Sequence, residues 1–227
     1  MVDAVKPIGD SWRFLKSNKS VFKPALISAV FTFFVYALFM FVLTSLLQTN
    51  PLLYLLLYIV LVVVGLVVGS FVALWTVSIV VKKGKSDYSE PIKRLPSAIG
   101  SSLLLSVVLV LGYMALIIPG IYLTIRLLFT SQAIMVDKKK AVESLEHSWA
   151  LTKNRWFDSF GFFIVLGLAC FVFLIPFFIG MVAVLISNPS LFLWFMIIYI
   201  SAVNIIITPL IYGALTFYYF ELKKDKK

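Results

Sequence analysis

The sequence predicts an all-α, polytopic membrane bundle with six transmembrane helices in three hairpins, joined by cytoplasmic amphipathic segments. Hydrophobic residues make up 62% of the chain and charged residues 13%, whereas a soluble domain has about 45–50% and about 25%. Two runs without Asp, Glu, Lys or Arg cover 58 residues at 24–81 and 62 residues at 159–220. Because a bilayer span needs about 20 apolar residues, each run is long enough for two spans.

Turn-forming residues divide the apolar runs into helices. The first run is interrupted by QTNP at 48–51, the last by SNPS at 187–190, and a middle run by PG at 119–120. The expected helices cover 22–47 and 52–82, then 98–117 and 121–136, then 157–186 and 190–220. Since the first apolar run has the length of a full span, we expect a membrane helix there and no cleaved signal peptide.

We expect one integral membrane domain over residues 1–227. Its parts are an amphipathic segment at 1–21, hairpin one at 22–82, a short segment at 83–97, hairpin two at 98–136, an amphipathic helix at 137–156, hairpin three at 157–220 and a basic tail at 221–227.

Nearly all charge falls between the predicted hairpins. Nineteen of the 20 basic residues and all ten acidic residues lie in 1–23, 82–94, 137–158 and the tail. By the positive-inside rule these segments and both termini face the cytoplasm, and we expect a plasma-membrane location. The net charge of +10 also suits nucleic acid, but we expect no such partner because topology already explains where the charges lie. Anionic lipid headgroups at the cytoplasmic face are the expected partners.

Two of the charged segments carry apolar stripes at helical spacing. The stripes are Val5, Ile8, Trp12 and Leu15 in the first segment, and Val142, Leu145 and Trp149 in the third, where Asp137 is the expected N-cap. Such helices either lie in the bilayer interface or pack on the protein's own helix ends. SWRFLKSN at 11–18 and SWALTKNR at 148–155 share Ser, Trp and Lys, which suggests an internal repeat.

Gly65 and Gly69 form a G-x-x-x-G pattern in the second predicted span. Small residues at this spacing let two helix backbones approach closely. The pattern fits helix packing inside one chain, and it also fits a homo-oligomer.

Three motifs carry a family resemblance: PGIYLTIRLLF at 119–129, AVESLEHSWALTKNRWFDSFG at 141–161 and PLIYGALTFYYFELKKDKK at 209–227. Together they resemble the six-helix membrane domain attached to some bacterial glycerophosphoryl diester phosphodiesterases, which also occurs alone in uncharacterised prokaryotic membrane proteins. The matching residues are Pro119, Gly120, Arg126, Ser148, Trp149, Leu151, Thr152, Trp156, Gly161, Pro209 and Tyr219. The resemblance implies a six-helix polytopic fold of poorly established role. It implies no enzyme activity, because the phosphodiesterase barrel is missing from the sequence.

Residues typical of catalytic or metal sites are scarce. His147 is the only histidine and lies on the charged face of its segment, and the single cysteine, Cys170, lies in an apolar run. The sequence has no Cys/His cluster, phosphate-binding loop or serine elbow with a histidine partner. We therefore predict no enzyme, no catalytic residue, no metal and no cofactor.

Arg126 is the basic residue that falls inside a predicted span. Counted from Gly120, it lies roughly 9 Å below the outer end of its helix. A central arginine costs about 2.5–3.5 kcal/mol on insertion scales, so we expect it to face the bundle. It bonds backbone carbonyls or hydroxyls, or else it holds an anion or phospholipid headgroup; an acidic partner is disfavoured because none lies at that depth. The hydroxyls considered are those of Ser102, Ser106, Tyr113 and Ser201.

Two functions fit the sequence. The first is membrane transport or lipid handling through the helix bundle, with Arg126 as the candidate anion or lipid contact. The second is a structural or partner-binding scaffold that uses the cytoplasmic amphipathic segments. A polar cavity opening to Arg126 would favour the first, and a sealed apolar interior would favour the second.

Overall fold

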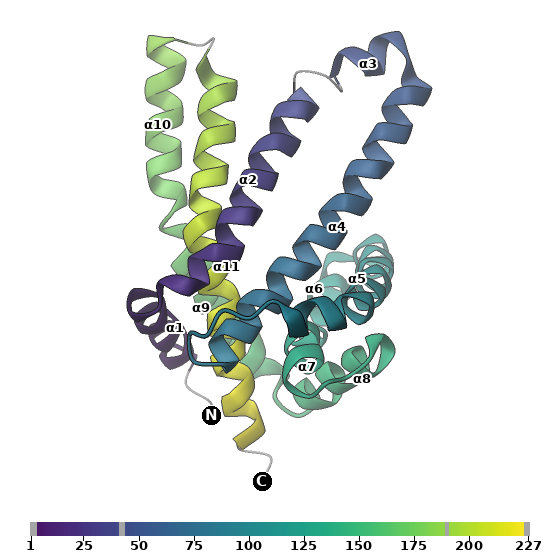
Figure 1. Ribbon diagram of the computed structural model, residues 1–227, viewed down its shortest axis with the longest axis vertical. Helices are drawn as coiled ribbons and strands as arrows, with labels where there is room; N and C mark the ends of the chain where they lie inside the picture. The colour runs from purple at the N-terminus through teal and green to yellow at the C-terminus, as the bar shows by residue number, and fades with distance from the viewer. Residues whose placement is uncertain (1–3, 41–43, 189–190, 225–227) are drawn as a thin grey trace.

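The computed structural model (Figure 1) describes residues 4–40, 44–188 and 191–224, which form helices joined by short turns. The helices are α1 (Lys6–Ser17), the 3₁₀ helix η1 (Lys19–Val21), α2 (Phe22–Leu38), α3 (Thr44–Thr49), α4 (Pro51–Val81), α5 (Ser89–Ala115), α6 (Ile117–Arg126), α7 (Thr130–Val136), α8 (Ala141–Thr152), α9 (Trp156–Phe171), α10 (Leu174–Ser187) and α11 (Phe192–Lys224). Within the described residues, six helical stretches are long and apolar enough to cross a membrane. The predicted all-α membrane fold is therefore confirmed.

Hairpin one consists of α2 and α4. The predicted helix 22–47 appears as α2 and α3 on either side of residues 41–43, which lie outside the described residues. The turn before α4 forms where QTNP predicts it: the side chain of Asn50 accepts a hydrogen bond from the Leu53 amide at 3.1 Å, and Pro51 is the first helical residue. Asparagine at the N-cap and proline directly after it are both favoured at a helix start.

Hairpin two begins earlier than predicted and turns at a different residue. α5 starts at Ser89, not near residue 98. Pro91 does not prevent this, because it lies in the first turn, where amide groups have no intrahelical acceptor. The turn to α6 falls at Leu116, whose backbone is extended with φ −175 and ψ 160, and not at 119–120. Pro119 instead lies in the first turn of α6, where proline is again tolerated.

The predicted helix 121–136 is also interrupted. It forms α6 and α7, separated by a turn at residues 127–129. Hairpin three has a similar break, because the predicted helix 157–186 forms α9 and α10 on either side of residues 172–173. At that break the Tyr199 hydroxyl donates a hydrogen bond to the Phe173 carbonyl. Residues 189–190 of the SNPS turn lie outside the described residues.

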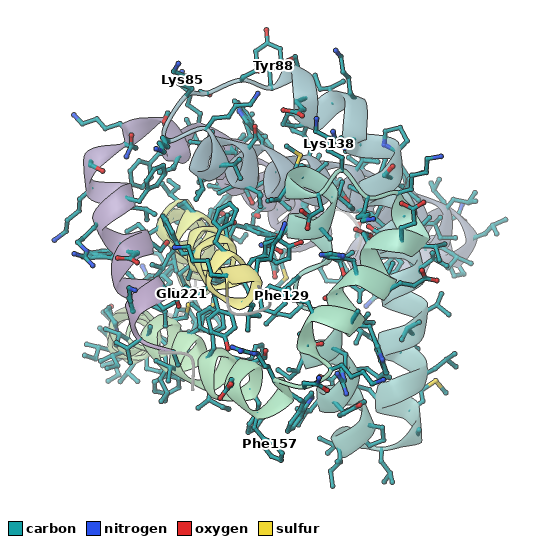
Figure 2. All side chains as sticks on the ribbon, turned by 90° about the horizontal axis from the view of Figure 1, so that it is seen from below. Lys85, Tyr88, Phe129, Lys138, Phe157 and Glu221 are labelled. Atoms are coloured by element: carbon teal, nitrogen blue, oxygen red, sulfur yellow. The ribbon has the colours of Figure 1, made fainter. Side chains whose placement is uncertain are left out.

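The hairpins spread from one shared end, which we call the base. In Figure 1, α2, α4 and α11 rise from the base, α10 lies beside the far part of α11, and both termini lie at the base. α5 is seen nearly along its axis in Figure 1 and along its length in Figure 2, so hairpin two runs across the long axis of the molecule. α1 and α8 also lie across this axis at the base. The charged residues between the hairpins therefore gather at one end of the protein.

The buried core lies near the base. One cluster is built around Phe129, Phe162, Tyr218 and Tyr219, a second around Leu15, Trp75 and Ile79, and a third around Leu74 and Ile134. Figure 2 shows Phe129 beside α11, near the middle of the base. Away from the base apolar side chains are exposed, and none of the α10 side chains is buried. Such an apolar surface suits contact with lipid.

Candidate functional site

Arg126 is the last residue of α6 and lies where α6 meets α8 and α9. Its side chain is largely buried, with the residue 7% exposed. Because α6 begins at Ile117, Arg126 lies nine residues along the helix, roughly 13 Å from the hairpin tip. It therefore lies nearer the base than the sequence predicted, beside the amphipathic helix α8.

Aromatic side chains surround the Arg126 guanidinium. Its central carbon lies 5.0 Å from the ring centroid of Tyr122 and 5.0 Å from that of Trp149. Its Nε and Nη2 donate to the Tyr122 hydroxyl at 2.9 and 2.7 Å. The Tyr122 ring stacks on Trp156 with centroids 5.7 Å apart. These contacts offset part of the cost of burying the charge, since each cation–π contact contributes about 0.5–2 kcal/mol.

One nitrogen of Arg126 has no hydrogen bond. Nη1 is buried and has no partner within the part of the chain that the structure describes. A buried charged donor without an acceptor is costly, and guanidinium groups suit the planar oxygen pairs of carboxylate and phosphate. Nη1 is therefore a buried charged donor that still lacks an acceptor among the described residues.

An apolar groove lies beside this arginine. It has a volume of about 350 Å³ and is lined by Val108, Leu127, Leu145, Glu146 and Trp149. Leu127 directly follows Arg126, and Trp149 contacts the guanidinium. Glu146 is the polar lining residue and is exposed. The groove therefore offers apolar surface next to the residues that cover the Arg126 guanidinium.

The Ser148 hydroxyl forms hydrogen bonds with backbone groups at the break between α6 and α7. Its hydroxyl donates to the Arg126 carbonyl at 2.9 Å and accepts from the Phe129 amide at 3.1 Å. The Thr152 hydroxyl lies 3.3 Å from the Arg126 carbonyl oxygen, and its one proton has the Ser148 carbonyl oxygen nearer, at 3.0 Å. Backbone groups at a helix end lack their regular partners, and hydroxyls from α8 supply them here. This fixes Arg126 against α8.

The structure thus brings together five residues of the family motifs: Arg126, Ser148, Trp149, Thr152 and Trp156. Pro119 and Gly120 both lie in α6, and Gly120 contributes to its fit against α5. A Cβ at Gly120 would lie 2.3 Å from a Tyr113 ring carbon. Of the other four, Leu151 and Tyr219 belong to the core cluster around Phe129, a Cβ at Gly161 would meet nothing within 4 Å, and Pro209 is buried inside α11.

The hydroxyls considered as partners of Arg126 are engaged elsewhere. Ser102 pairs with Ser70 at 3.2 Å, and Tyr113 pairs with Thr124 at 3.1 Å. Ser106 and Ser201 donate to carbonyls of their own helices. The actual hydroxyl partner, Tyr122, lies one turn earlier on the same helix, so the i, i+4 spacing in the sequence could have identified it.

The glycine pair of α4 has two different surroundings. A Cβ at Gly65 would lie 3.8 Å from the Phe31 ring of α2, which is ordinary contact within hairpin one. A Cβ at Gly69 would meet nothing within 4 Å, and Gly69 is exposed. Gly65 therefore serves the internal packing.

The inward face of α8 differs from its predicted stripe, whereas in α1 two stripe residues, Ile8 and Leu15, pack against the core. In α8 the buried residues include Ser144, Ser148 and Thr152, whereas Val142 is 57% and Trp149 37% exposed. The apolar stripe was expected to mark the packing face or the bilayer face. Trp149 packs over the Arg126 guanidinium and against the Tyr122 ring although it is partly exposed, whereas the small hydroxyl residues form the fully buried contact of α8.

The suggested repeat has a structural counterpart. In α1, Ser11 is buried and its hydroxyl donates to the Leu210 carbonyl of α11 at 3.0 Å, while the neighbouring Trp12 is 41% exposed. Ser148 and Trp149 have the same arrangement in α8. In both helices a buried serine bonds the backbone of a span, and the next residue, a tryptophan, faces outward.

The sequence did not indicate a cluster around Asp137. Asp137 ends α7 and is not the N-cap of α8, which is Lys140. Its carboxylate accepts hydrogen bonds from Tyr219 and Lys223 of α11, and His147 Nε2 lies 3.0 Å away. Burial raises the pKa of this carboxyl, but the hydrogen bonds from Lys223 and Tyr219 outweigh burial and hold the pKa below its ordinary value.

Comparisons with known proteins give a family without an assigned role. No curated protein and no solved structure matches the chain. Within the described residues, no three or more His, Cys, Asp or Glu side chains are grouped so that they could hold a metal ion. Residues 92–222, which include every residue around Arg126, match a domain of unknown function, DUF7847. Because this match covers more than half of the chain, the protein belongs to the DUF7847 family.

Proposed function

We propose that this multi-pass membrane protein handles lipids and binds an anionic phospholipid at Arg126. The observation that carries the proposal is the buried Nη1 of Arg126, which has no hydrogen-bond partner among the described residues. A phospholipid phosphate supplies the missing acceptor. No catalytic step is part of the proposal.

The surroundings of Arg126 favour a lipid over a small hydrated anion. The groove beside it is lined mainly by apolar side chains, which suit an acyl chain and offer little to a hydrated solute. The same lining favours lipid handling over transport of a polar substrate. Trp149, which lies over the guanidinium, is a residue type enriched at headgroup level.

In the proposed orientation, the base lies on the cytoplasmic side of a plasma membrane that is rich in anionic lipid. The support is the concentration of 19 of the 20 basic residues in the four segments between and after the hairpins. Anionic lipids of the inner leaflet are then the lipids within reach of Arg126. The resemblance to the membrane domain of the glycerophosphoryl diester phosphodiesterases stays a prediction.

A scaffold function is the second candidate, and one observation favours it. Trp12, Val142 and Trp149 are exposed on helices that lie across the base. If these side chains bind a protein partner and not the bilayer, they remain accessible to water in a membrane without that partner. Tryptophan fluorescence with aqueous iodide as quencher distinguishes the two: strong quenching supports the scaffold, and protection supports the bilayer interface.

Native mass spectrometry tests the lipid site. The protein is extracted in mild detergent and given equal amounts of phosphatidylglycerol and phosphatidylcholine. Wild type should retain phosphatidylglycerol, Arg126→Leu should lose it, and Arg126→Lys should retain less because lysine lacks the planar fork. The matched control is Arg13→Leu, which removes an exposed arginine paired with Asp10. Unchanged lipid retention in Arg126→Leu, with the fold intact by circular dichroism, would refute the proposal.

A further inference from the structure

A second groove lies at the base, between α1 and the last turns of α11. It has a volume of about 440 Å³, and its lining includes lysine, carboxylate and phenylalanine side chains. This volume is within the range of small-ligand sites, about 300–1,000 Å³. Ser11 fixes α1 to α11 through its hydrogen bond to the Leu210 carbonyl, so the two walls of the groove are held together.

Two of the charged lining residues are already paired. Asp10 accepts from Arg13 at 2.6 Å, and Lys223 donates to Asp137. A third pair joins Lys6 Nζ to Glu221 Oε1 at 3.3 Å, and Lys224 is the other charged lining residue. These three residues set the chemistry that a ligand of this groove meets.

Glu221 offers one oxygen to a donor. Its Oε1 lies 3.3 Å from Lys6 Nζ, whereas its Oε2 is buried and has no hydrogen-bond partner among the residues that the structure describes. Figure 2 places Glu221 on the side of α11 that faces α1. A buried carboxylate oxygen is best satisfied by a charged N–H donor.

The same groove also suits a phosphate and an apolar chain. Lys6 and Lys224 provide cationic donors for phosphate oxygens. Phe217 and Phe220 line the groove on the α11 side and provide apolar surface. A ligand that satisfies all three features carries a primary ammonium, a phosphodiester and hydrocarbon in one molecule.

We infer that the groove between α1 and α11 binds the headgroup of an aminophospholipid of the phosphatidylethanolamine type. Its ammonium donates to Glu221 Oε2, and its phosphate lies by Lys6 and Lys224. Phosphatidylcholine fits less well, because its quaternary nitrogen has no N–H to donate. Phosphatidylglycerol has no cation for Glu221. The groove shares none of its lining residues with the Arg126 site, so this inference does not rest on the proposed function.

A lipid competition tests the inference. The full-length protein is incorporated into nanodiscs containing equal amounts of phosphatidylethanolamine, phosphatidylcholine and phosphatidylglycerol, and the retained lipids are identified by native mass spectrometry after ejection from the disc. Wild type should retain phosphatidylethanolamine over phosphatidylcholine. Glu221→Gln should reduce this preference about tenfold or more, because a hydrogen bond to a charged group is lost. Retained phosphatidylglycerol reports the Arg126 site separately.

Two further variants control the result. Glu143→Gln removes an acidic charge from α8 and keeps the capping function, which glutamine also provides; it should leave the preference unchanged. Lys6→Gln breaks the same ion pair with Glu221 but keeps the carboxylate, so it should preserve selection of the ammonium and weaken total retention. Equal retention of the two zwitterionic lipids by wild type would overturn the inference. So would an unchanged preference in Glu221→Gln, or equal loss of it in Lys6→Gln.

Displacement of the lipid by soluble phosphoethanolamine at millimolar concentration would show that the headgroup alone suffices and would overturn the role given to the phenylalanines.

Discussion

Ser148→Ala should destabilise the protein more than its size suggests. The Ser148 hydroxyl is fully buried and makes two hydrogen bonds across the α6–α7 break, to the Arg126 carbonyl and from the Phe129 amide. The Arg126 carbonyl still has the Thr152 hydroxyl 3.3 Å away. Losing its bond from Ser148 should therefore lower the free energy of unfolding by about 0.5–1.5 kcal/mol. The Phe129 amide loses its acceptor, and a buried amide left without an acceptor lowers the free energy of unfolding by about 1–3 kcal/mol. The expected total loss in the free energy of unfolding is about 1.5–4.5 kcal/mol.

The free energy of unfolding, measured by titration with sodium dodecyl sulfate in mixed micelles, tests this value. Hydrogen bonds between membrane helices contribute about 0.6 kcal/mol on average, so a loss of about 2 kcal/mol or more identifies the unpaired backbone amide as the cause. Ser106→Ala is the control, because Ser106 is exposed and its hydroxyl bonds a carbonyl of its own helix. If the free energy of unfolding falls by the same amount in both variants, the Ser148 hydroxyl does not stabilise the break between α6 and α7.

Three further outcomes are expected. Asp137→Asn should lower the melting temperature at pH 7 because it weakens the bond to Lys223. The folded pKa of Asp137 is below its ordinary value of 3.8, so the stabilisation by its carboxylate is present above pH 3.8 and is lost as pH falls through the folded pKa. The difference in melting temperature from wild type should shrink in that range, and a pH-independent difference would contradict this. Gly120→Ala should destabilise by about 1–3 kcal/mol through overpacking against Tyr113, and an unchanged unfolding midpoint would show that the ring moves aside. In a background without the native cysteine, Thr49→Cys should react with a membrane-impermeant maleimide outside intact cells, and labelling only after lysis would reverse the proposed orientation.

Long-range regularities of the sequence were sufficient to predict the fold class. The uncharged runs at 24–81 and 159–220 determine how many helices can cross a bilayer, because backbone groups in lipid must be satisfied within helices. The side of the membrane on which the base lies is a separate inference from charge, and the labelling experiment addresses it.

The helix breaks were not predictable from local residues. Residues 127–129 are Leu-Leu-Phe, which contain neither proline nor glycine and continue an apolar run. The break is stabilised by Ser148, which is 22 residues distant from Arg126 in the chain. Prolines mislead in the opposite direction: Pro91, Pro96 and Pro119 suggest helix boundaries. Pro91 and Pro119 instead lie in first turns, where proline is tolerated, and Pro96 lies inside α5.

The candidate site was predictable in part. Arg126 stands out in an apolar span, and the family motifs include Ser148, Trp149 and Trp156. The sequence did not reveal that the α8 residues meet Arg126, because this depends on how α8 folds back on α6. The apolar stripe of α8 left open whether Trp149 meets the bilayer or the protein; it packs over Arg126, while the fully buried contact is made by Ser148, whose small side chain lets the helices approach.

The most direct test of the account is the distance between Arg126 and a lipid phosphate. Solid-state NMR on protein with ¹⁵N-labelled arginine in phosphatidylglycerol bilayers measures the ¹⁵N–³¹P dipolar coupling, and Arg126→Leu assigns the signal among the four arginines of the chain. We expect a ¹⁵N–³¹P coupling that corresponds to a hydrogen bond, with about 2.7–3.2 Å from Nη1 to a phosphate oxygen. This coupling should be lost in Arg126→Leu. A spectrum in which wild type and Arg126→Leu show the same ¹⁵N–³¹P coupling would contradict it.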